Sequence, residues 1–209
     1  MIARGAPPAI LFAPALAMIG VVGAVLLLER WALIWVSVPC GLVFLVFLAF
    51  FRDPAREIGP GVVSPADGRV LSADPASRAI SIFMGVADVH VNRAPLAGVV
   101  HLQDHRPGGF AVASKPEAAR NERLEWEFTT RLGPLRLTQV AGAFARRIVP
   151  YLHEGDKVKK GQRIGLVRFG SRVDLVLPPG CRVTAVAGDR VRAGASTIAE
   201  VPDGLGLGP

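Results

Sequence analysis

The step from Gly170 to Ser171 is the part of this sequence whose residue types suggest unusual backbone chemistry. It lies in the run Arg168–Asp174, between two apolar segments, and glycine leaves its carbonyl accessible to a neighbouring atom. Attack of the Ser171 hydroxyl oxygen on the Gly170 carbonyl carbon would convert the peptide into an ester. β-Elimination would then leave dehydroalanine, which hydrolyses to an N-terminal pyruvoyl group. Taken alone, the same step also fits a tight turn, because Gly-Ser is common in loops.

Two further residues have side chains suited to proton transfer. His90 fits a general acid or base, because an imidazole titrates near neutral pH and could take the Ser171 proton or protonate a carbanion. A single histidine in such a chain also has an ordinary structural interpretation. Asp67 precedes Gly68, and this pair reads locally as a β-turn. Residue type alone therefore leaves both roles open.

The segment after Phe51 must position these residues, and its pattern predicts a mainly β domain. Short apolar runs that alternate or are β-branched, such as Ala79–Phe83, Leu135–Thr138 and Arg172–Leu177, are separated by glycine and proline. This residue pattern favours strands over helices. We expect a β-sandwich or half-barrel-like arrangement.

An internal sequence repeat supports paired hairpins within this domain. The run Gly155–Gly161 reappears as Gly188–Gly194, with Gly-Asp at its start and a glycine at its end. Gly-Asp makes a turn, and the second glycine permits positive φ before the next strand. The hairpins resemble those of biotinyl and lipoyl carrier domains, so a non-enzymatic membrane-bound carrier or adaptor is the alternative function. Neither copy has a lysine at a hairpin tip flanked as those carriers require.

The first 52 residues form a predicted membrane anchor, followed by a catalytic domain over residues 53–209. Uncharged stretches at residues 9–28 and 31–51 are separated only by Glu29-Arg30. About 20 helical residues match a hydrocarbon core of roughly 30 Å, so we expect a two-span transmembrane helical hairpin. A cleaved signal peptide is the alternative, but a second stretch follows at once without a convincing small-residue cleavage site.

Charge predicts where the anchor lies. Arg4 precedes the spans and Arg52 and Arg56 follow them, which places both termini and the catalytic domain in the cytoplasm, at the cell (inner) membrane. The net charge of +7 and pI near 10.4 would also suit a nucleic-acid-binding membrane protein. The interleaved aromatic and basic residues of a single-strand platform are missing, so we expect no nucleic-acid partner.

The residues around these candidates resemble those of phosphatidylserine decarboxylases, of the short pyruvoyl-dependent proenzyme type. Five motifs occur in the order of that family and span about Arg52 to Val201. They are Val63–Gly68, Asp88–Pro95, Asn121–Arg123, Gln139–Gly142 with Ala145–Val149, and Phe169–Ser171.

The resemblance implies a zymogen that cuts itself between Gly170 and Ser171 into a β chain, residues 1–170, and an α chain, residues 171–209. The two chains would stay together as a heterodimer, and a higher oligomer stays open. The covalent pyruvoyl cofactor derived from Ser171 would form a Schiff base with the amino group of a membrane phospholipid and act as an electron sink. The implied activity is that of a carboxy-lyase which converts phosphatidylserine to phosphatidylethanolamine in phospholipid biosynthesis, with either an acyl or an isoprenoid lipid tail.

The resemblance also suggests roles for individual side chains. Asp67 would help a histidine to deprotonate Ser171 during self-cleavage, and His90 would be catalytic. Longer relatives carry a second histidine where this sequence has Arg93, so His90, another residue or none must fill that role. The Arg93 guanidinium could instead bind the phosphate or carboxylate of the substrate.

No metal site is expected. His101, Asp104 and His105 have a helical ligand spacing, but glycine and proline around them indicate strand and loop. Cys40 and Cys181 have neither CxxC spacing nor metal-ligand companions, so we interpret both as ordinary apolar residues.

Overall fold

The computed structural model describes most of the chain and divides it into two compact units, Met1–Asp53 and Pro54–Pro209. The described residues are 3, 16–17, 19–20, 22–23, 30–109, 111, 120–142, 147–168 and 171–202. At residues 30–34, 36 and 171 only the backbone is described.

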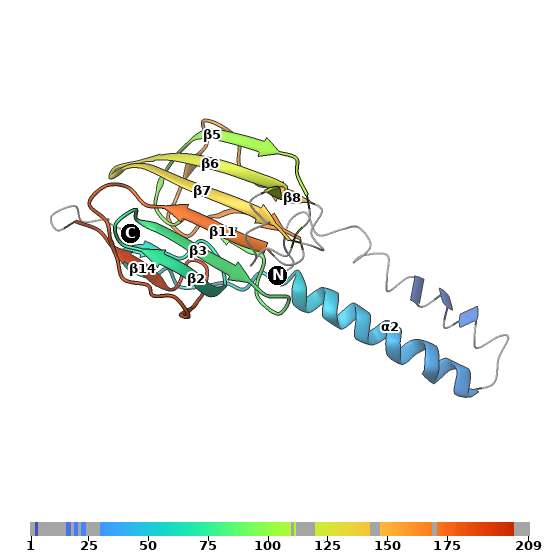
Figure 1. The fold of residues 1–209 in the computed structure, drawn as a ribbon. Helices are drawn as coiled ribbons and strands as arrows, with labels where there is room; N and C mark the ends of the chain where they lie inside the picture. Colours follow the sequence, from blue (N-terminus) through green and yellow to red (C-terminus); the bar gives the residue numbers. More distant parts are fainter. Residues whose placement is uncertain are drawn as a thin grey trace. The chain divides into compact units, whose positions relative to one another are not determined.

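The first unit contains helix α2 (Arg30–Phe50), which covers the second predicted span (Figure 1). The first predicted span, residues 9–28, lies mostly outside the described residues. In the part of the chain that the structure describes, no helix meets the length and hydropathy of a membrane-crossing segment. The two-span hairpin therefore stays a prediction.

The second unit is built from antiparallel strands, which confirms the mainly β prediction (Figure 1). Within the described residues they form three open sheets, so the strands do not close into a barrel. The large sheet has, in order, β13 (Arg190–Val191), β2 (Gly68–Asp74), β3 (Ala79–Met84), β11 (Ser171–Val176), β7 (Gly133–Ala141), β6 (Arg123–Thr130), β5 (Gly98–Arg106) and β9 (Lys157–Val158). One small sheet has, in order, β1 (Val62–Val63), β14 (Thr197–Glu200) and β12 (Arg182–Val183). The other has β4 (Val91–Arg93), β10 (Arg163–Val167) and β8 (Ile148–Pro150).

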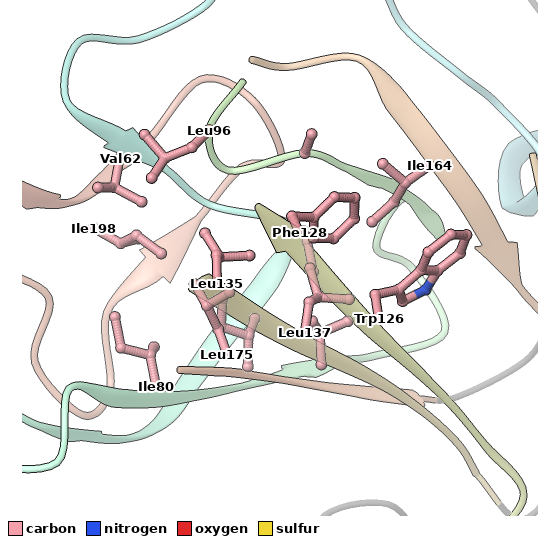
Figure 2. Packing of buried hydrophobic residues seen from close by; sticks show 14 of the residues in the cluster. Val62, Ile80, Leu96, Trp126, Phe128, Leu135, Leu137, Ile164, Leu175 and Ile198 are labelled. Carbon is pink, nitrogen blue, oxygen red and sulfur yellow. The ribbon is translucent and has the colours of Figure 1, made fainter. Parts of the chain in front are cut away.

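One hydrophobic core joins the three sheets. Alternate side chains of β3 and β6 are buried, as expected for strands with one face on a core. Val62 and Ile198 reach this core from one small sheet and Ile164 from the other, and they belong to one cluster with residues of the large sheet such as Leu135 and Leu137 (Figure 2). Burial of each such side chain contributes about 1.5–3 kcal/mol. The small sheets are thus packed against the large one through a common interior.

The two Gly-Asp hairpins expected from the sequence are present and are built alike. Gly155 and Gly188 have φ of 86° and 99°. The Asp156 carboxylate accepts a hydrogen bond from the backbone N–H three residues earlier at 2.8 Å, and the Asp189 carboxylate does the same at 3.0 Å. The local prediction of paired turns is therefore confirmed.

These hairpins belong to a larger internal repeat. Val70 of β2 donates its backbone N–H to Asp189 O at 2.9 Å, and Val100 of β5 donates to Asp156 O at the same distance. A register shift follows each of the two valines. When the strands of the large sheet are counted inward from its two edges, they correspond in pairs. The pairs are β13 and β9, β2 and β5, β3 and β6, and, at the centre, β11 and β7. The small sheets correspond in the same way.

An approximate twofold axis between β7 and β11 therefore relates two halves of the catalytic unit. The continuous half contains β4 to β10, whereas the split half contains β1 to β3 and β11 to β14. In the continuous half, β6 and β7 are joined by a short turn, and Thr130 pairs with Gly133. In the split half, Met84 pairs with Ser171 at the corresponding place. The predicted cleavage site thus occupies the position of a hairpin turn.

Candidate functional site

Residue 171 is located by its backbone pairing. It begins β11 and pairs with Met84, the last residue of β3, and with Ala141, the last residue of β7. Gly170 and the side chain of Ser171 lie outside the described residues. The residue predicted to become the cofactor therefore begins a central strand, at the end of the sheet where β3 and β7 stop.

His90 lies next to this end of the sheet and is fully buried. Its backbone carbonyl accepts a hydrogen bond from Val167 N–H at 3.2 Å, which places it beside the segment leading to residue 171. The imidazole Nδ1 is 2.8 Å from Asp88 O. Because a carbonyl can only accept, Nδ1 must carry a proton, so a neutral His90 has its lone pair on Nε2. That nitrogen is thus the one able to accept a proton.

Asp67 is almost buried and takes part in an ion pair that its sequence motif does not reveal. Both carboxylate oxygens accept from the Arg56 guanidinium, the Oδ2 contact being 2.8 Å. Asp67 Oδ1 also accepts from Ala193 N–H at 2.8 Å, and Arg56 donates to Ala193 O at 3.1 Å. Among the described residues, the partners of Asp67 are therefore Arg56 and Ala193 rather than His90.

The turn at Asp67 nevertheless lies close to residue 171. A Cβ added at Gly68 would be 2.0 Å from Phe83 O and 3.2 Å from Met84 Cα. Gly68 has a φ of 140°, which a side chain would disfavour. Since Met84 pairs with Ser171, the two strand spacings from β2 to β11 separate the turn from residue 171 by roughly 10 Å.

Arg93 is buried, with 7% of its surface exposed. Its guanidinium donates to Gly161 O and to Pro54 O, both at 3.1 Å. Its backbone N–H donates to Pro65 O at 2.9 Å. These contacts connect three separate segments of the catalytic unit and give the side chain a structural use. Its role in substrate binding stays a prediction.

A buried polar chain under this site was not predicted from the sequence. Trp126 Nε1 donates to Gln139 Oε1 at 2.8 Å, and Gln139 Nε2 donates to Asn92 Oδ1 at 2.6 Å. Asn92 Nδ2 in turn donates to Met84 Sδ at 3.4 Å. Gln139 follows Leu135 and Leu137 at alternate positions, so a glutamine on the inward face was the available signal.

Asn121 anchors the other neighbour of residue 171. Its Nδ2 donates to Ala141 O and to Ala111 O, both at 2.7 Å, and its Oδ1 accepts from Ala111 N–H at 2.8 Å. The backbone N–H of Ala141 donates to Glu122 O at 2.9 Å. The Asn121 motif therefore holds the end of β7 in place, and the described parts of all five sequence motifs reach the same end of the large sheet.

Two of the other polar candidates, Asp104 and His105, are paired with nearby side chains. Asp104 is bonded to Arg106 at 2.8 Å, whereas His105 Nε2 is 2.9 Å from Glu122 Oε1. In the described ranges, no group of three histidine, cysteine, aspartate or glutamate residues is arranged to hold a metal ion. Cys181 is buried, and burial raises the pKa of its thiol, with the charge of Arg78 opposing this effect.

Comparison with known proteins identifies the family. Residues 43–199 match the family model described as phosphatidylserine decarboxylase. The chain is 50% identical over 201 residues to the phosphatidylserine decarboxylase proenzyme of Streptomyces griseus, covering 94% of this chain and 92% of the relative. It is 51% identical over 153 residues to the protein of that name from Thermobifida fusca, covering 71% and 70%.

A third relative is named for a different lipid. Over 159 residues the chain is 44% identical to a Methanosarcina mazei protein, covering 75% of this chain and 76% of the relative. That protein's name, archaetidylserine decarboxylase proenzyme, is itself a provisional assignment. The family match covers most of the catalytic unit, including every motif that meets at residue 171. The chain therefore belongs to the phosphatidylserine decarboxylase family.

Proposed function

We propose that this protein is a phosphatidylserine decarboxylase made as a proenzyme, a carboxy-lyase that converts phosphatidylserine to phosphatidylethanolamine. The observation that carries the proposal is the pairing of residue 171 with Met84 and Ala141, at the end of the sheet where all five family motifs meet. Relatives about half identical to this chain over most of its length are named for this activity and as proenzymes.

Maturation is a self-cleavage between Gly170 and Ser171. The Ser171 hydroxyl oxygen attacks the Gly170 carbonyl carbon, and the chain opens through the resulting ester. His90 accepts the hydroxyl proton on Nε2, a role supported by the hydrogen bond that keeps the proton on Nδ1. Asp67 assists from the turn beside Met84, where its negative charge favours a protonated imidazole; its pair with Arg56 moderates that effect.

The products of this cut are a β chain, residues 1–170, and an α chain, residues 171–209, which remain a heterodimer. The α chain begins with β11, and this strand pairs with β3 on one side and β7 on the other, both from the β chain. The buried residues Val173 and Leu175 of β11 also belong to the common core. These contacts support continued association without the covalent link.

A pyruvoyl group derived from Ser171 is the proposed cofactor, and it supplies an electron sink for the electrons left when carbon dioxide departs. The chain fits such a group because residue 171 is the first residue of β11. A pyruvoyl group at this position would leave the strand pairing of β11 intact. His90 holds or returns a proton at Nε2 in a site shielded from water, as its complete burial supports.

The proposed place of action is the cytoplasmic face of the cell membrane, because the substrate is a membrane phospholipid. Apolar side chains of α2 are exposed, among them Trp35 at 78% and Leu42 at 63%, which supports an apolar environment for this helix. The chemistry addresses only the serine headgroup, so the proposal covers acyl and isoprenoid tails alike.

Substitution of Ser171 by Ala tests the proposal. The variant should remain one uncut chain with no decarboxylase activity, whereas the natural protein should yield a fragment of residues 171–209 with a blocked N-terminus. Intact mass spectrometry should find that fragment lighter by one ammonia than a fragment beginning with serine. An unbroken natural protein that still decarboxylates phosphatidylserine would refute the cleavage mechanism.

A further inference from the structure

A cavity lies at the same end of the large sheet as residue 171. It has a volume of about 340 Å³, and its polar lining comes from Gln103, His105, Glu122 and Arg147. Glu122 connects the cavity to the site, because its backbone carbonyl accepts from the N–H of Ala141, the β7 partner of residue 171. The cavity is therefore next to the proposed reaction centre and has no assigned role.

Two arginines come from chain segments that meet beside the cavity. Arg147 precedes β8 and lines the cavity, and Arg168 follows β10. The two chain segments are joined by a hydrogen bond from Arg168 N–H to Arg147 O at 3.3 Å. Burial, and then the positive charge of Arg147, lower the pKa of Arg168 from its ordinary value.

Arg147 is exposed, and the described part of the chain gives it no acidic partner. Among the described residues, no carboxylate lies within ion-pair distance of this guanidinium. Glu122, the acidic residue among the described lining residues, is directed to His105, with 2.9 Å between Glu122 Oε1 and His105 Nε2. The Arg147 guanidinium, with a second guanidinium from Arg168 nearby, is suited to an anion with several oxygens.

Gln103 provides a further donor in the cavity lining. Gln103 Nε2 is buried and, among the described residues, has no hydrogen-bond partner. An amide N–H buried without an acceptor is costly, and a ligand oxygen in the cavity would satisfy it. The cavity thus offers positive charge and neutral donors within a few residues of the proposed electron sink.

We propose that Arg147 and Arg168 bind the phosphodiester of the serine phospholipid, with the cavity taking the polar headgroup. This inference rests on the proposed function, because it assigns the substrate contact of that same site. Phosphate held at these arginines keeps the serine amine within reach of residue 171, while the acyl chains remain outside. The two arginines are substrate-binding residues and take no part in the self-cleavage chemistry.

Kinetics of Arg147→Ala on the mature enzyme provide the test. We expect complete self-cleavage, a KM for phosphatidylserine in mixed detergent micelles raised roughly tenfold to a hundredfold, and kcat within about twofold of the natural value. Arg147→Lys should recover part of the loss, because it keeps the charge without the planar fork. Arg136→Ala is the matched control, since Arg136 is 71% exposed, pairs with Glu127 and lies at the other end of β7.

A substrate without phosphate separates phosphate binding from a general disturbance of the site. With O-decyl-serine, which keeps the free amine and carboxylate, Arg147→Ala and the natural enzyme should have the same KM. Calorimetric binding of monomeric dihexanoyl phosphatidylethanolamine should weaken by the same factor as KM for phosphatidylserine.

The outcomes distinguish this inference from the proposed function. If the natural protein decarboxylates phosphatidylserine but Arg147→Ala leaves its KM unchanged, the phosphate site is wrong and the function stands. An equal loss with O-decyl-serine, or failure of Arg147→Ala and Arg147→Lys to self-cleave, would also overturn the phosphate assignment. A natural protein with neither cleavage nor decarboxylation would instead refute the function itself.

Discussion

The two ends of the β3–β11–β7–β6 region are built alike but are connected differently. In the continuous half, Thr130 and Gly133 pair across a turn, and the Thr130 hydroxyl donates to Gly133 O at 2.7 Å. In the split half, Met84 and Ser171 form the corresponding pair, yet the chain between them runs through the whole continuous half. One end is therefore a local hairpin, and the other is a junction of distant segments.

This difference would allow the proposed cut at residue 171 to leave the sheet folded. Strand β11 begins at this junction. Its residues Ser171 to Val176 pair with β3 on one side and β7 on the other, and none of these pairs involves Gly170. The covalent bond contributes to stability mainly by limiting the unfolded chain. The reactive end can thus lose a peptide bond without losing the sheet that supports it.

The largest expected effect comes from comparing the equivalent glycines Gly68 and Gly98. Gly68→Ala should destabilise the fold by about 3 kcal/mol and prevent cleavage, because its Cβ would meet Phe83 O at 2.0 Å and its φ is positive. Gly98→Ala should cost about 1–2 kcal/mol and permit cleavage, since its Cβ would lie 2.6 Å from Thr129 O. Urea unfolding and electrophoresis measure both effects; equal behaviour of the two variants would contradict the contrast.

The Arg56–Asp67 ion pair should hold the two chains together after cleavage. Both side chains contact the backbone of Ala193, which belongs to the α chain, and both are largely buried. Arg56→Gln should lower the free energy of unfolding of the mature protein by about 2 kcal/mol, because Asp67 keeps its charge without its guanidinium partner. Glu200→Gln, which removes an exposed pair with Arg182, should cost less than about 0.5 kcal/mol. A larger loss in the exposed pair would count against this assignment.

The buried chain through Gln139 should have a somewhat smaller effect. Gln139→Leu leaves the Asn92 amide and the Trp126 N–H without their partner, so we expect a loss of about 1–2 kcal/mol and slower self-cleavage. Thr138→Val, at the neighbouring half-buried position, should change stability by less than about 0.5 kcal/mol. Time courses of self-cleavage provide the second measurement. Equal cleavage rates in the two variants would show that the buried hydrogen bonds of Gln139 do not support the site.

The smallest effect concerns the thiol of Cys181, which reports whether the α chain stays docked. Its pKa is raised by burial, so at a given pH less thiolate is present and reaction with a maleimide should be slow. Cleavage should leave this rate unchanged, whereas unfolding should raise it to that of a free thiol. A rapid rise upon cleavage alone would mean that the α chain dissociates.

Prediction from the sequence succeeded where the signal was local. The twin Gly-Asp hairpins, the alternating strands and the order of the motifs around Ser171 are all patterns of neighbouring residues. Arg56 was missed as the partner of Asp67, because no spacing rule connects an arginine before the first strand to a turn beyond it. The guanidinium of Arg93 was interpreted as a substrate contact, and only its neighbours in space revealed the backbone carbonyls that it binds.

By itself, the sequence determined the β class and the turn chemistry, since these depend on side-chain type and short periodicity, and it predicts Ser171 as the residue at which the chain is cut. The tertiary structure decided that two repeated halves enclose one core, that residue 171 takes the place of a hairpin turn, and that Arg147 and Arg168 meet beside it. The physical reason is that strand pairing brings together segments far apart in the chain. Their contacts follow from the register of the whole sheet and not from any stretch of residues within it.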